Sequence, residues 1–182
     1  MCALRIIAGS LKGRELQSPA GRDFRPMSSQ VRNALFNMLA PELAGARVLD
    51  MYAGSGAVGL EAFSRGVAEV VFVDCDCAVL TESLRRLALQ GRLAVLEGAA
   101  DEMARYLVQK AEKFDIIIAD PPYQDYDFEL YRRWRLEELL ERGGMAVFSH
   151  GARDGPPGEW PGMALEKEKD FGDTRLTAWR KS

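Results

Sequence analysis

Short apolar runs alternate with longer amphipathic stretches over most of the chain, and this alternation constrains the fold more than any other feature. Several runs are nearly continuously apolar, as strands buried on both faces of a sheet must be: residues 46–51, 69–73, 94–97, 114–119 and 145–149. The stretches between them have apolar side chains at helical spacing: residues 58–64, 78–89, 101–110 and 128–140. We expect Asp101 to cap the third of these helices. The order βαβαβαβαβ predicts an α/β, Rossmann-like fold with a mostly parallel sheet and helices on both faces.

The last part of the chain has a different pattern. Residues 163–169 and 174–180 are two extended candidates joined by a tight polar turn at residues 170–173. Such a pair predicts a C-terminal antiparallel hairpin at the edge of the sheet, which then has seven strands. A chain of 182 residues has the length of one ordinary domain, so we expect a single structural domain.

Residues 1–40 differ from the rest in charge. The first 35 residues contain six Lys and Arg residues against two acids, whereas the whole chain has a formal net charge of −3. A helix is expected to follow a capping Ser28 or Ser29, because apolar residues recur at helical spacing from Val31 to Leu39. We therefore divide the chain into a basic N-terminal extension, residues 1–40, and a Rossmann-like domain, residues 41–182. Since the whole molecule has no cationic field, a nucleic-acid partner has to be held by a local patch.

Composition excludes other classes of protein. The apolar runs are far shorter than the roughly 20 residues that span a bilayer, and the N-terminus lacks the features of a secretory signal. We therefore expect a cytoplasmic protein without a membrane partner. The three cysteines are an odd number, and Cys75 and Cys77 are spaced too closely for a redox or zinc motif. Free thiols and no metal site are the expectation.

The first motif with chemical meaning runs from Val48 to Gly59. An apolar strand that contains Asp50 leads through Gly54-Ser-Gly56 into a helix. Glycine is needed where the backbone bends sharply or lets a ligand approach closely, and the helix N-terminus presents unpaired N–H groups. The motif predicts a nucleoside-type cofactor, although the glycine pattern alone is shared by several cofactor classes.

Asp50 favours one of these classes. We expect its carboxylate to point into the cavity above the strand ends, where it repels a pyrophosphate but pairs with an ammonium group. S-adenosyl-L-methionine has an amino group and a sulfonium, whereas NAD has two phosphates. Asp74, at the end of the next strand, is placed to accept hydrogen bonds from ribose hydroxyls of either cofactor. The remaining expected cofactor-binding residues line the same loops: Tyr52, Ala53, Gly54, Ser55, Gly56 and Cys75.

The second motif, Asp120-Pro121-Pro122-Tyr123, directly follows the strand at residues 114–119. The two prolines hold the strand-end carbonyl, the carboxylate and the ring in one arrangement. An exocyclic amine on a base is a poor nucleophile because its lone pair is delocalised into the ring. Acceptors such as the Asp120 carboxylate and the Pro121 carbonyl would favour a pyramidal nitrogen aimed at a methyl sulfonium, while Tyr123 stacks on the base. These residues are the expected catalytic group.

Both motifs together resemble those of class I S-adenosylmethionine-dependent amino-methyltransferases that act on nucleic-acid bases. The whole chain is similar to the bacterial RsmD-type family, which methylates the exocyclic N2 amine of one guanine in 16S rRNA. The resemblance extends from end to end, through Arg5-Ile-Ile-Ala-Gly9, Lys12-Gly-Arg14, Arg25-Pro26, Val31-Arg32, Ala34-Leu-Phe-Asn37, Ala53-Gly-Ser-Gly56, Gly59-Leu-Glu-Ala62, Ser64-Arg-Gly66 and residues 172–179.

The resemblance implies a partner and further contacts. The partner is 16S rRNA in a partly assembled small ribosomal subunit, with Arg5, Lys12, Arg14, Arg25 and Arg32 on its phosphates. Backbone groups at Gly98 and Ala99 would hold the adenine. The chain departs from the family pattern at Met27, Ser29, Gln30, Asn33 and Ala99, and we transfer no role to Met27, Ser29 or Gln30.

Other functions remain open at this point. An Asp-Pro-Pro-Tyr motif also occurs in adenine-N6 methyltransferases that act on DNA or RNA. The glycine loop is compatible with a NAD-binding oxidoreductase or regulatory module, and a non-catalytic binding module is the simplest alternative. Glu61 is expected on the helix surface or as a cap partner.

Overall fold

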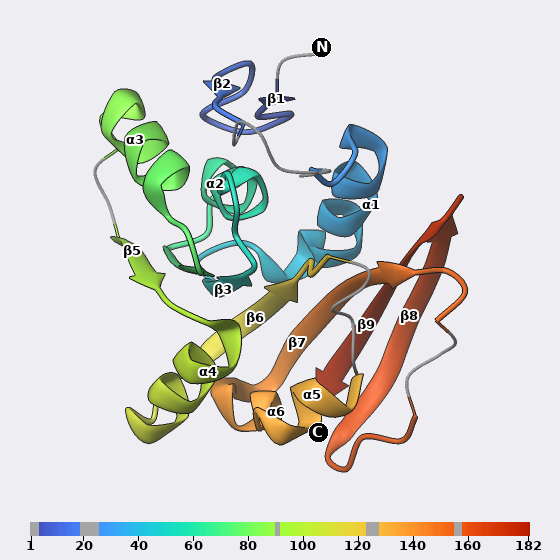
Figure 1. Cartoon of the computed structure of the whole chain (residues 1–182). Helices are drawn as coiled ribbons and strands as arrows, with labels where there is room; N and C mark the ends of the chain where they lie inside the picture. Colours follow the sequence, from blue (N-terminus) through green and yellow to red (C-terminus); the bar gives the residue numbers. More distant parts are fainter. Residues whose placement is uncertain (1–3, 19–25, 90–91, 123–127, 155–157) are drawn as a thin grey trace.

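The computed structural model describes residues 4–18, 26–89, 92–122, 128–154 and 158–182. Its main sheet has seven strands in the order β5-β4-β3-β6-β7-β9-β8 (Figure 1). The strands are β3 (Arg47–Met51), β4 (Glu69–Asp74), β5 (Arg92–Glu97), β6 (Phe114–Ala119), β7 (Leu140–Gly151), β8 (Met163–Phe171) and β9 (Thr174–Lys181). Strands β3 to β7 pair in parallel, while β9 is antiparallel to both β7 and β8. The predicted fold class and C-terminal hairpin are confirmed.

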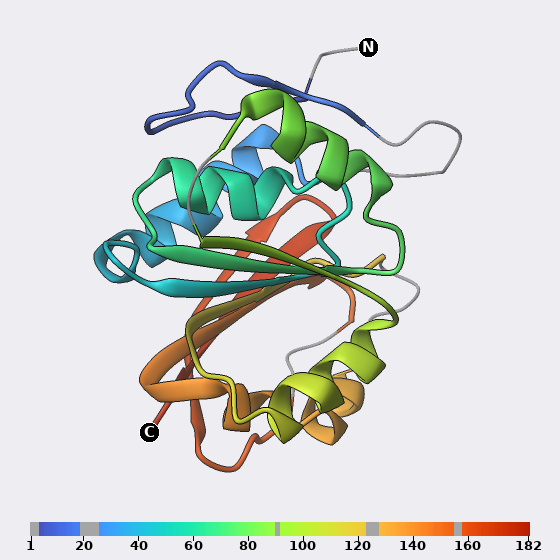
Figure 2. The same ribbon diagram turned by 90° about the vertical axis from the view of Figure 1, so that its left-hand side faces the viewer.

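Helices cover both faces of this sheet (Figure 2). One face has α1 (Ser29–Leu39), α2 (Ala57–Ser64) and α3 (Ala78–Leu87), and the other has α4 (Ala100–Gln109), α5 (Phe128–Arg133) and α6 (Leu136–Leu139). Each face has its own buried apolar cluster, because alternate residues of the buried strands point to opposite sides. In β3, Val48 packs towards α2 and Leu49 packs towards α4. No described helix is long and apolar enough to cross a membrane.

A small hairpin that the sequence did not predict lies outside the α2 and α3 layer. Its strands β1 (Leu4–Arg5) and β2 (Glu15–Leu16) are two residues each, too short to leave a periodic pattern. Figure 2 shows the hairpin running along α2, with its turn at the end of α2 that is distant from the glycine loop. Ile6 and Leu16 are buried in the same cluster as α1 and α2.

Several predicted helix boundaries were wrong for local reasons. The helix expected over residues 128–140 is two helices, because Arg135 adopts a left-handed φ of 58° between them. Asp101 does not cap α4, since the capping position is Ala99 and Asp101 lies in the first turn. Helix α3 ends at Leu87, where Ala88 has a φ of 48°. A short 3₁₀ helix, η1 (Ala40–Glu42), contains Pro41 after α1.

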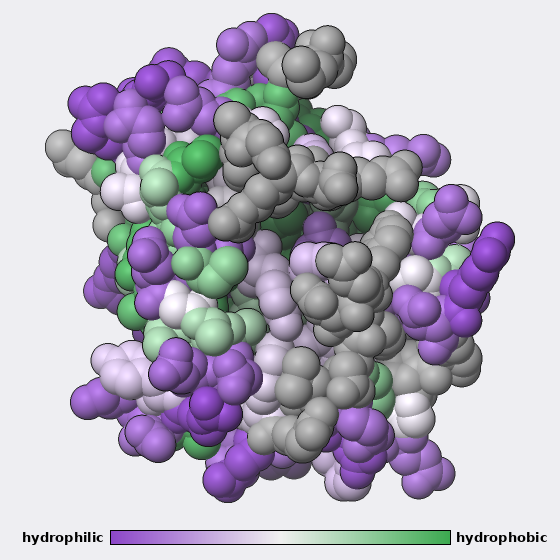
Figure 3. Space-filling model, viewed as in Figure 1, coloured by the Kyte–Doolittle hydropathy of each residue, from purple (hydrophilic) through white to green (hydrophobic). Residues whose placement is uncertain are grey.

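The edge of the sheet at β8 is strongly charged. Residues 166–170 read Glu-Lys-Glu-Lys-Asp, and all of them are exposed. Charged side chains on an outer strand discourage pairing with another chain. On the face shown in Figure 3, hydrophilic residues gather at the end of the β8–β9 hairpin and around α3.

The connections of the sheet predict a ligand-binding crevice beyond the carboxyl ends of β3 and β6. From β3 the chain moves to β4 and β5 on one side, and then crosses to β6 on the other side of β3. In open α/β sheets, ligands bind beyond the carboxyl ends of the strands at such a switch point. The loop after β3 and the loop after β6 are therefore the two expected walls of one site.

Candidate active site

The loop after β3 curls tightly before α2 begins. Tyr52, Gly54 and Gly56 have positive φ values of 63°, 53° and 76°. The Ala53 amide donates to the Val73 carbonyl at 3.0 Å, and the Gly56 amide donates to the Ala53 carbonyl at 2.7 Å. The positive φ favours glycine at position 56, and a Cβ there would lie 2.4 Å from Leu80 Cδ1, so the Leu80 side chain would have to move. Helix α2 starts without a side-chain cap, which leaves its first turn suited to a polar ligand.

Asp50 is placed differently from the expectation. Its side chain is almost fully buried, and its Oδ2 accepts a hydrogen bond from the Gly59 amide at 2.8 Å, inside α2. The carboxylate therefore ties the strand to the helix rather than simply facing the cavity. Burial raises the pKa of Asp50 to about 7, the Gly59 hydrogen bond lowers it, and the charges of Asp120 and Asp74 raise it further.

Asp74 organises two turns at the end of β4. Its Oδ2 accepts from the Gly54 amide at 2.7 Å, and its Oδ1 accepts from the Asp76 amide at 3.1 Å. The side chain of Cys75, which is exposed, lies 3.5 Å from the same Oδ1. Asp74 thus connects the loop that follows β3 with the end of β4. Since each carboxylate oxygen has two lone pairs, these contacts leave acceptor capacity for a ribose hydroxyl.

Gly98 and Ala99 form the next part of the same edge. The Gly98 amide donates to the Asp74 carbonyl at 2.9 Å, and the exposed Ala99 precedes α4. A Cβ on Gly98 would lie 2.9 Å from Met103 Cε. The ends of β5, β4 and β3 therefore bring Ala99, Asp74 and the glycine loop into one row.

Asp120 lies across the switch point from this row. Residue 120 follows β6 directly, Pro121 is buried and Pro122 is exposed. The Ser149 hydroxyl donates to the Asp120 carboxylate from β7, and the strand register explains this contact because Ala119 pairs with Phe148. Burial raises the pKa of Asp120 to about 6, while the Ser149 hydrogen bond lowers it. Tyr123 lies outside the described residues.

The crevice is consequently acidic. The charges of Asp120 and Asp74 both reach Asp50 and raise its pKa. Such a site favours a ligand with positive charge and disfavours a pyrophosphate, because like charges in a poorly solvated place repel strongly. The charge of this site therefore matches a ligand with a sulfonium and an ammonium group better than one with a pyrophosphate.

Sequence reasoning missed the role of Ser149, the contact that the expected cofactor-binding residue Tyr52 makes, and the burial of Glu61 nearby in α2. Ser149 was visible only as the polar end of an apolar run, and its role depends on the pairing of β6 with β7. Tyr52 packs against Trp134, with ring centroids 6.2 Å apart, which brings α5 and α6 close to the glycine loop. Glu61 was expected on the helix surface or as a cap partner, but it is fully buried. An acid inside the apolar run 57–62 was the one signal that pointed to it.

The predicted phosphate-binding residues do not all lie on the surface. Arg5, Lys12 and Arg14 are exposed on the hairpin, and Arg25 lies outside the described residues. The prediction for Arg32 was wrong, because its side chain is 1% exposed. Its Nη2 donates to the Arg5 carbonyl at 2.6 Å, so it serves the internal structure instead of reaching solvent. Within the described ranges, no group of three or more His, Cys, Asp or Glu side chains is arranged to hold a metal ion.

The strand order, the glycine loop and the Asp-Pro-Pro turn define a Rossmann-like methyltransferase of class I. Comparison with known proteins narrows the class. A family model described as conserved hypothetical protein 95 matches residues 4–180. Putative rRNA methyltransferase YlbH of Bacillus subtilis is 31% identical over 98% of this chain and 99% of its own length. Ribosomal RNA small subunit methyltransferase D of Escherichia coli is 39% identical over 78% of this chain and 68% of its own length.

Solved structures agree. The putative methyltransferase yhhF from Escherichia coli superposes with a TM-score of 0.85 at 32% identity, covering 99% of this chain and 98% of that one. The putative methylase HI0767 from Haemophilus influenzae has a TM-score of 0.81 at 27% identity, with 99% of both chains covered. The chain belongs to the conserved hypothetical protein 95 family, the RsmD-type family to which the sequence motifs pointed.

Proposed function

We propose that this protein transfers a methyl group from S-adenosyl-L-methionine to the exocyclic N2 amine of a specific guanine in 16S rRNA. The observation that carries the proposal is the position of Asp120 at the switch point, beside the loop of Gly54 and Gly56. The carboxylates of Asp50 and Asp120 are close enough for the charge of Asp120 to raise the pKa of Asp50. Adjoining pockets for donor and acceptor are what a direct transfer requires.

One wall of the crevice would hold the cofactor. The amides of the glycine loop and of the first turn of α2 would contact its polar groups, and Asp74 would accept from the ribose hydroxyls. The exposed edge at Gly98 and Ala99 would contact the adenine through backbone groups. Asp50, whose pKa is about 7 without ligand, would become more fully ionised beside the ammonium group and supply negative charge there. S-adenosyl-L-methionine, when bound, supplies a methyl group on a positively charged sulfonium.

The other wall would hold the target amine. Asp120, whose pKa is about 6, is ionised at neutral pH and accepts a hydrogen bond from the guanine N2 amine. The Pro121 carbonyl offers a second acceptor, so the nitrogen lone pair is directed into the crevice. Methylation makes this nitrogen acidic, and its proton leaves afterwards to water. Asp120 therefore orients the amine and stabilises its developing positive charge, and no strong base is needed.

The identity of the substrate is supported by charge and by the relatives. An acidic crevice repels phosphates, so a base has to enter while its backbone stays outside, as in base flipping. Exposed cations on the hairpin offer a separate contact for the backbone. Relatives that cover most of this chain bear names of rRNA methyltransferases. With a net charge of −3, the protein is expected to recognise a partly assembled small subunit better than free RNA.

The test is transfer of tritium from labelled S-adenosyl-L-methionine to rRNA from a strain that lacks this enzyme, followed by nucleoside digestion and mass analysis. We expect N2-methylguanosine in 16S rRNA from small-subunit particles. N6-methyladenosine would support the adenine-N6 alternative, and no transfer to any rRNA would reject the proposal. Titration calorimetry with S-adenosylhomocysteine and NAD separates the oxidoreductase alternative, because a NAD-binding protein would ignore the former.

A further inference from the structure

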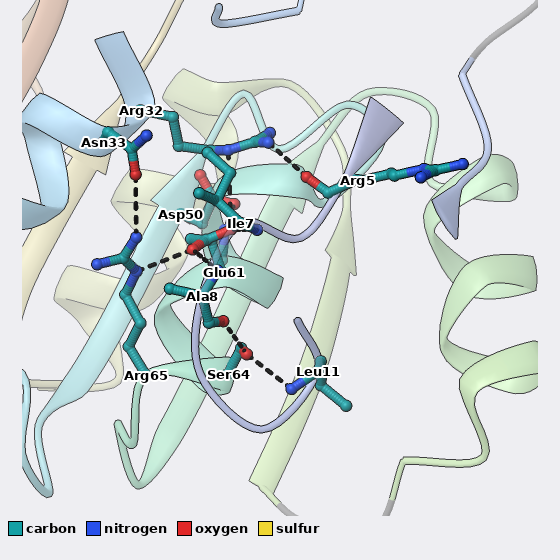
Figure 4. A network of polar contacts seen from close by, with 11 residues as sticks. Arg5, Ile7, Ala8, Leu11, Arg32, Asn33, Asp50, Glu61, Ser64 and Arg65 are labelled. Carbon is teal, nitrogen blue, oxygen red and sulfur yellow. Dashed lines mark hydrogen bonds and ion pairs between the residues drawn. The ribbon is translucent and has the colours of Figure 1, made fainter. Parts of the chain in front are cut away.

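Glu61 is a buried carboxylate that joins the N-terminal hairpin to α2 (Figure 4). Its Oε2 accepts from the Ile7 amide at 2.6 Å, and its Oε1 accepts from the Ala8 amide at 2.9 Å. Arg65 Nε donates to the same Oε1 at 2.8 Å, and Arg32 Nε lies 3.9 Å from Oε2. A fully buried charge is tolerated only with such partners. Two of the partners are backbone amides of the segment that follows β1, so the carboxylate fixes the position of that segment.

Ser64 makes a second connection on the same side of the helix, three residues after Glu61. Its hydroxyl donates to the Ala8 carbonyl and accepts from the Leu11 amide at 2.9 Å. The Ser64 carbonyl also accepts from the Ser10 amide at 2.8 Å. Gly9 lies directly against this point, since a Cβ there would be 1.8 Å from the Ser64 carbonyl oxygen. Residues 7–11 are therefore seated on α2 with little freedom to slide.

Arg32 adds a third connection, from α1. Its guanidinium donates to the Arg5 carbonyl and faces Glu61, as Figure 4 shows. The hairpin is consequently held by two different helices. Helix α2, which seats it, begins at the glycine loop and holds Asp50 through the Gly59 amide. One rigid element thus connects the hairpin to the candidate active site.

The seating of the hairpin on α2 also fixes the position of the cations at the hairpin turn. Lys12 and Arg14 are exposed, and neither forms an ion pair with any residue that the structure describes. Arg5 differs, because it pairs with Glu15 at 2.5 Å. The turn lies at the C-terminal end of α2, and a helix of eight residues is about 12 Å long. Lys12 and Arg14 therefore face a part of the substrate that is distant from the target base.

We propose that Glu61 is a positioning residue for RNA recognition. By seating the hairpin on α2, it sets where Lys12 and Arg14 meet phosphates of the substrate at a distance from the target nucleotide. The inference rests on the proposed function. It predicts that loosening the hairpin weakens substrate binding by removing the contribution of these two cations, while the crevice and its chemistry stay intact.

The chain offers a matched pair of substitutions for the test. Gly9→Ala introduces a methyl group against the Ser64 carbonyl, whereas Gly13→Ala has nothing within 4 Å. Both glycines have nearly the same positive φ, 82° and 83°, so the backbone strain is shared and only the first displaces the hairpin. Neither change alters a charge. We expect Gly9→Ala to raise KM for the ribosomal particle on the order of tenfold, and Gly13→Ala to leave it within about twofold. The kcat and the affinity for S-adenosylhomocysteine should stay unchanged in both.

Two further variants address the hairpin connections themselves. Glu61→Gln places an amide donor against a backbone amide and should resemble Gly9→Ala. Ser64→Ala removes the hydroxyl but keeps a good helix former, so it remains informative if the other variants fold poorly. We expect a smaller increase in KM from Ser64→Ala, with the same unchanged kcat. A lower kcat with an unchanged KM, or a loss of S-adenosylhomocysteine binding, would assign Glu61 to the crevice and overturn the proposal.

A double-mutant cycle decides whether Glu61 acts through the two cations. Lys12→Ala combined with Arg14→Ala should reduce the slope of log affinity against log salt by about 1.4 for two phosphate contacts on a single strand. In the Gly9→Ala background the same pair should cost almost nothing, because the cations no longer reach the phosphates. Fully additive effects, or equal KM values for Gly9→Ala and Gly13→Ala, would overturn the proposal. Failure of the wild-type protein to methylate any rRNA would instead reject the proposed function, so the two failures are distinguishable.

Discussion

The two walls of the crevice use their carboxylates in different ways. On the side of β3 and β4, Asp50 and Asp74 accept hydrogen bonds from backbone amides of the chain itself, at Gly59 and Gly54. On the side of β6 and β7, Asp120 is held by a side-chain hydroxyl, that of Ser149. Removing an acid from the first wall is expected to change the shape of a loop, whereas under the proposed function removing Asp120 changes a group that faces the substrate. Under the proposed function, the first wall defines the shape of the cofactor site and the second wall takes part in the reaction.

The difference teaches how one acidic site can serve both purposes. Acids that are engaged by the backbone keep a fixed geometry and still contribute charge. An acid held by a single hydroxyl keeps lone pairs for a substrate, because a carboxylate accepts several hydrogen bonds. We therefore expect substitutions on the two walls to affect different measurements, namely stability or cofactor affinity on one wall and turnover on the other.

The largest effect is expected from Asp120→Asn. The substitution puts an amide, with a donor group, where the guanine amine needs an acceptor, and it removes the negative charge that stabilises the transition state. We expect kcat to fall by roughly 10²- to 10³-fold, with S-adenosylhomocysteine affinity within about threefold of wild type. Asp101→Asn, an equal change of charge on the exposed side of α4, is the control. Retained turnover in Asp120→Asn would contradict the division between the walls.

Asp50→Asn is expected to change the free energy of unfolding rather than the turnover number. Because the folded pKa of Asp50 is about 7 and the unfolded value is about 3.9, folding takes up a proton between these values. Its contribution to stability is therefore present in full below about pH 4 and is lost as the pH rises through 7. The loss above pH 7 is on the order of 4 kcal/mol in the free energy of unfolding, because each unit of pKa difference corresponds to about 1.4 kcal/mol.

An asparagine at position 50 keeps an oxygen for the Gly59 amide but has no charge to bury. We expect Asp50→Asn to be more stable than wild type at pH 8 and about equally stable at pH 4.5, as measured by denaturant unfolding without ligand. Asp101→Asn should show no such dependence on pH. If the free energy of unfolding changed by the same amount between pH 5 and 8 in wild type and in Asp50→Asn, Asp50 would be ionised in the folded protein at little cost.

Asp74→Ala tests the first wall directly. Loss of the carboxylate frees the Gly54 and Asp76 amides, so the loop loses its connection to β4. We expect the dissociation constant for S-adenosylhomocysteine to rise by roughly tenfold to a hundredfold, with kcat at saturating cofactor much less affected. Glu97→Ala is a matched control, because Glu97 accepts from the Cys77 amide at 3.2 Å without reaching the glycine loop. Equal effects of the two substitutions would remove Asp74 from the binding site.

The sequence was informative where function depends on local order. Strand ends, glycine loops and the Asp-Pro-Pro turn are contiguous features, so the row from Asp50 to Asp74 and the position of Asp120 followed from the parallel order of the strands. The helix from residue 128 to 140 failed because a single left-handed residue, Arg135, breaks a pattern that is otherwise helical. Backbone angles of this kind have no signature in hydrophobic spacing.

Contacts across the chain were beyond sequence reasoning for a different reason. The charge of Arg32 marked it as exposed, but its burial depends on a carbonyl 27 residues earlier and on a carboxylate in α2. Glu61 accepts hydrogen bonds from the backbone amides of residues more than 50 positions away. Ser149 meets Asp120 only through the register of β6 and β7. Each of these roles is decided by tertiary pairing, which a pattern along one chain does not contain.

The smallest expected effect comes from Ser149→Ala, and it tests how the second wall is tuned. The Ser149 hydroxyl lowers the pKa of Asp120, so its removal raises that pKa above about 6. Because turnover requires the ionised carboxylate, the acidic limb of the kcat profile should move to higher pH by up to about one unit. We expect kcat near wild type at pH 8.5 and several-fold lower at pH 6.5. Ser83→Ala is the control, since Ser83 is also buried but its hydroxyl has no hydrogen-bond partner in the described structure. A uniform loss of kcat at every pH would mean that Ser149 positions Asp120 without setting its charge, and the second wall would then resemble the first.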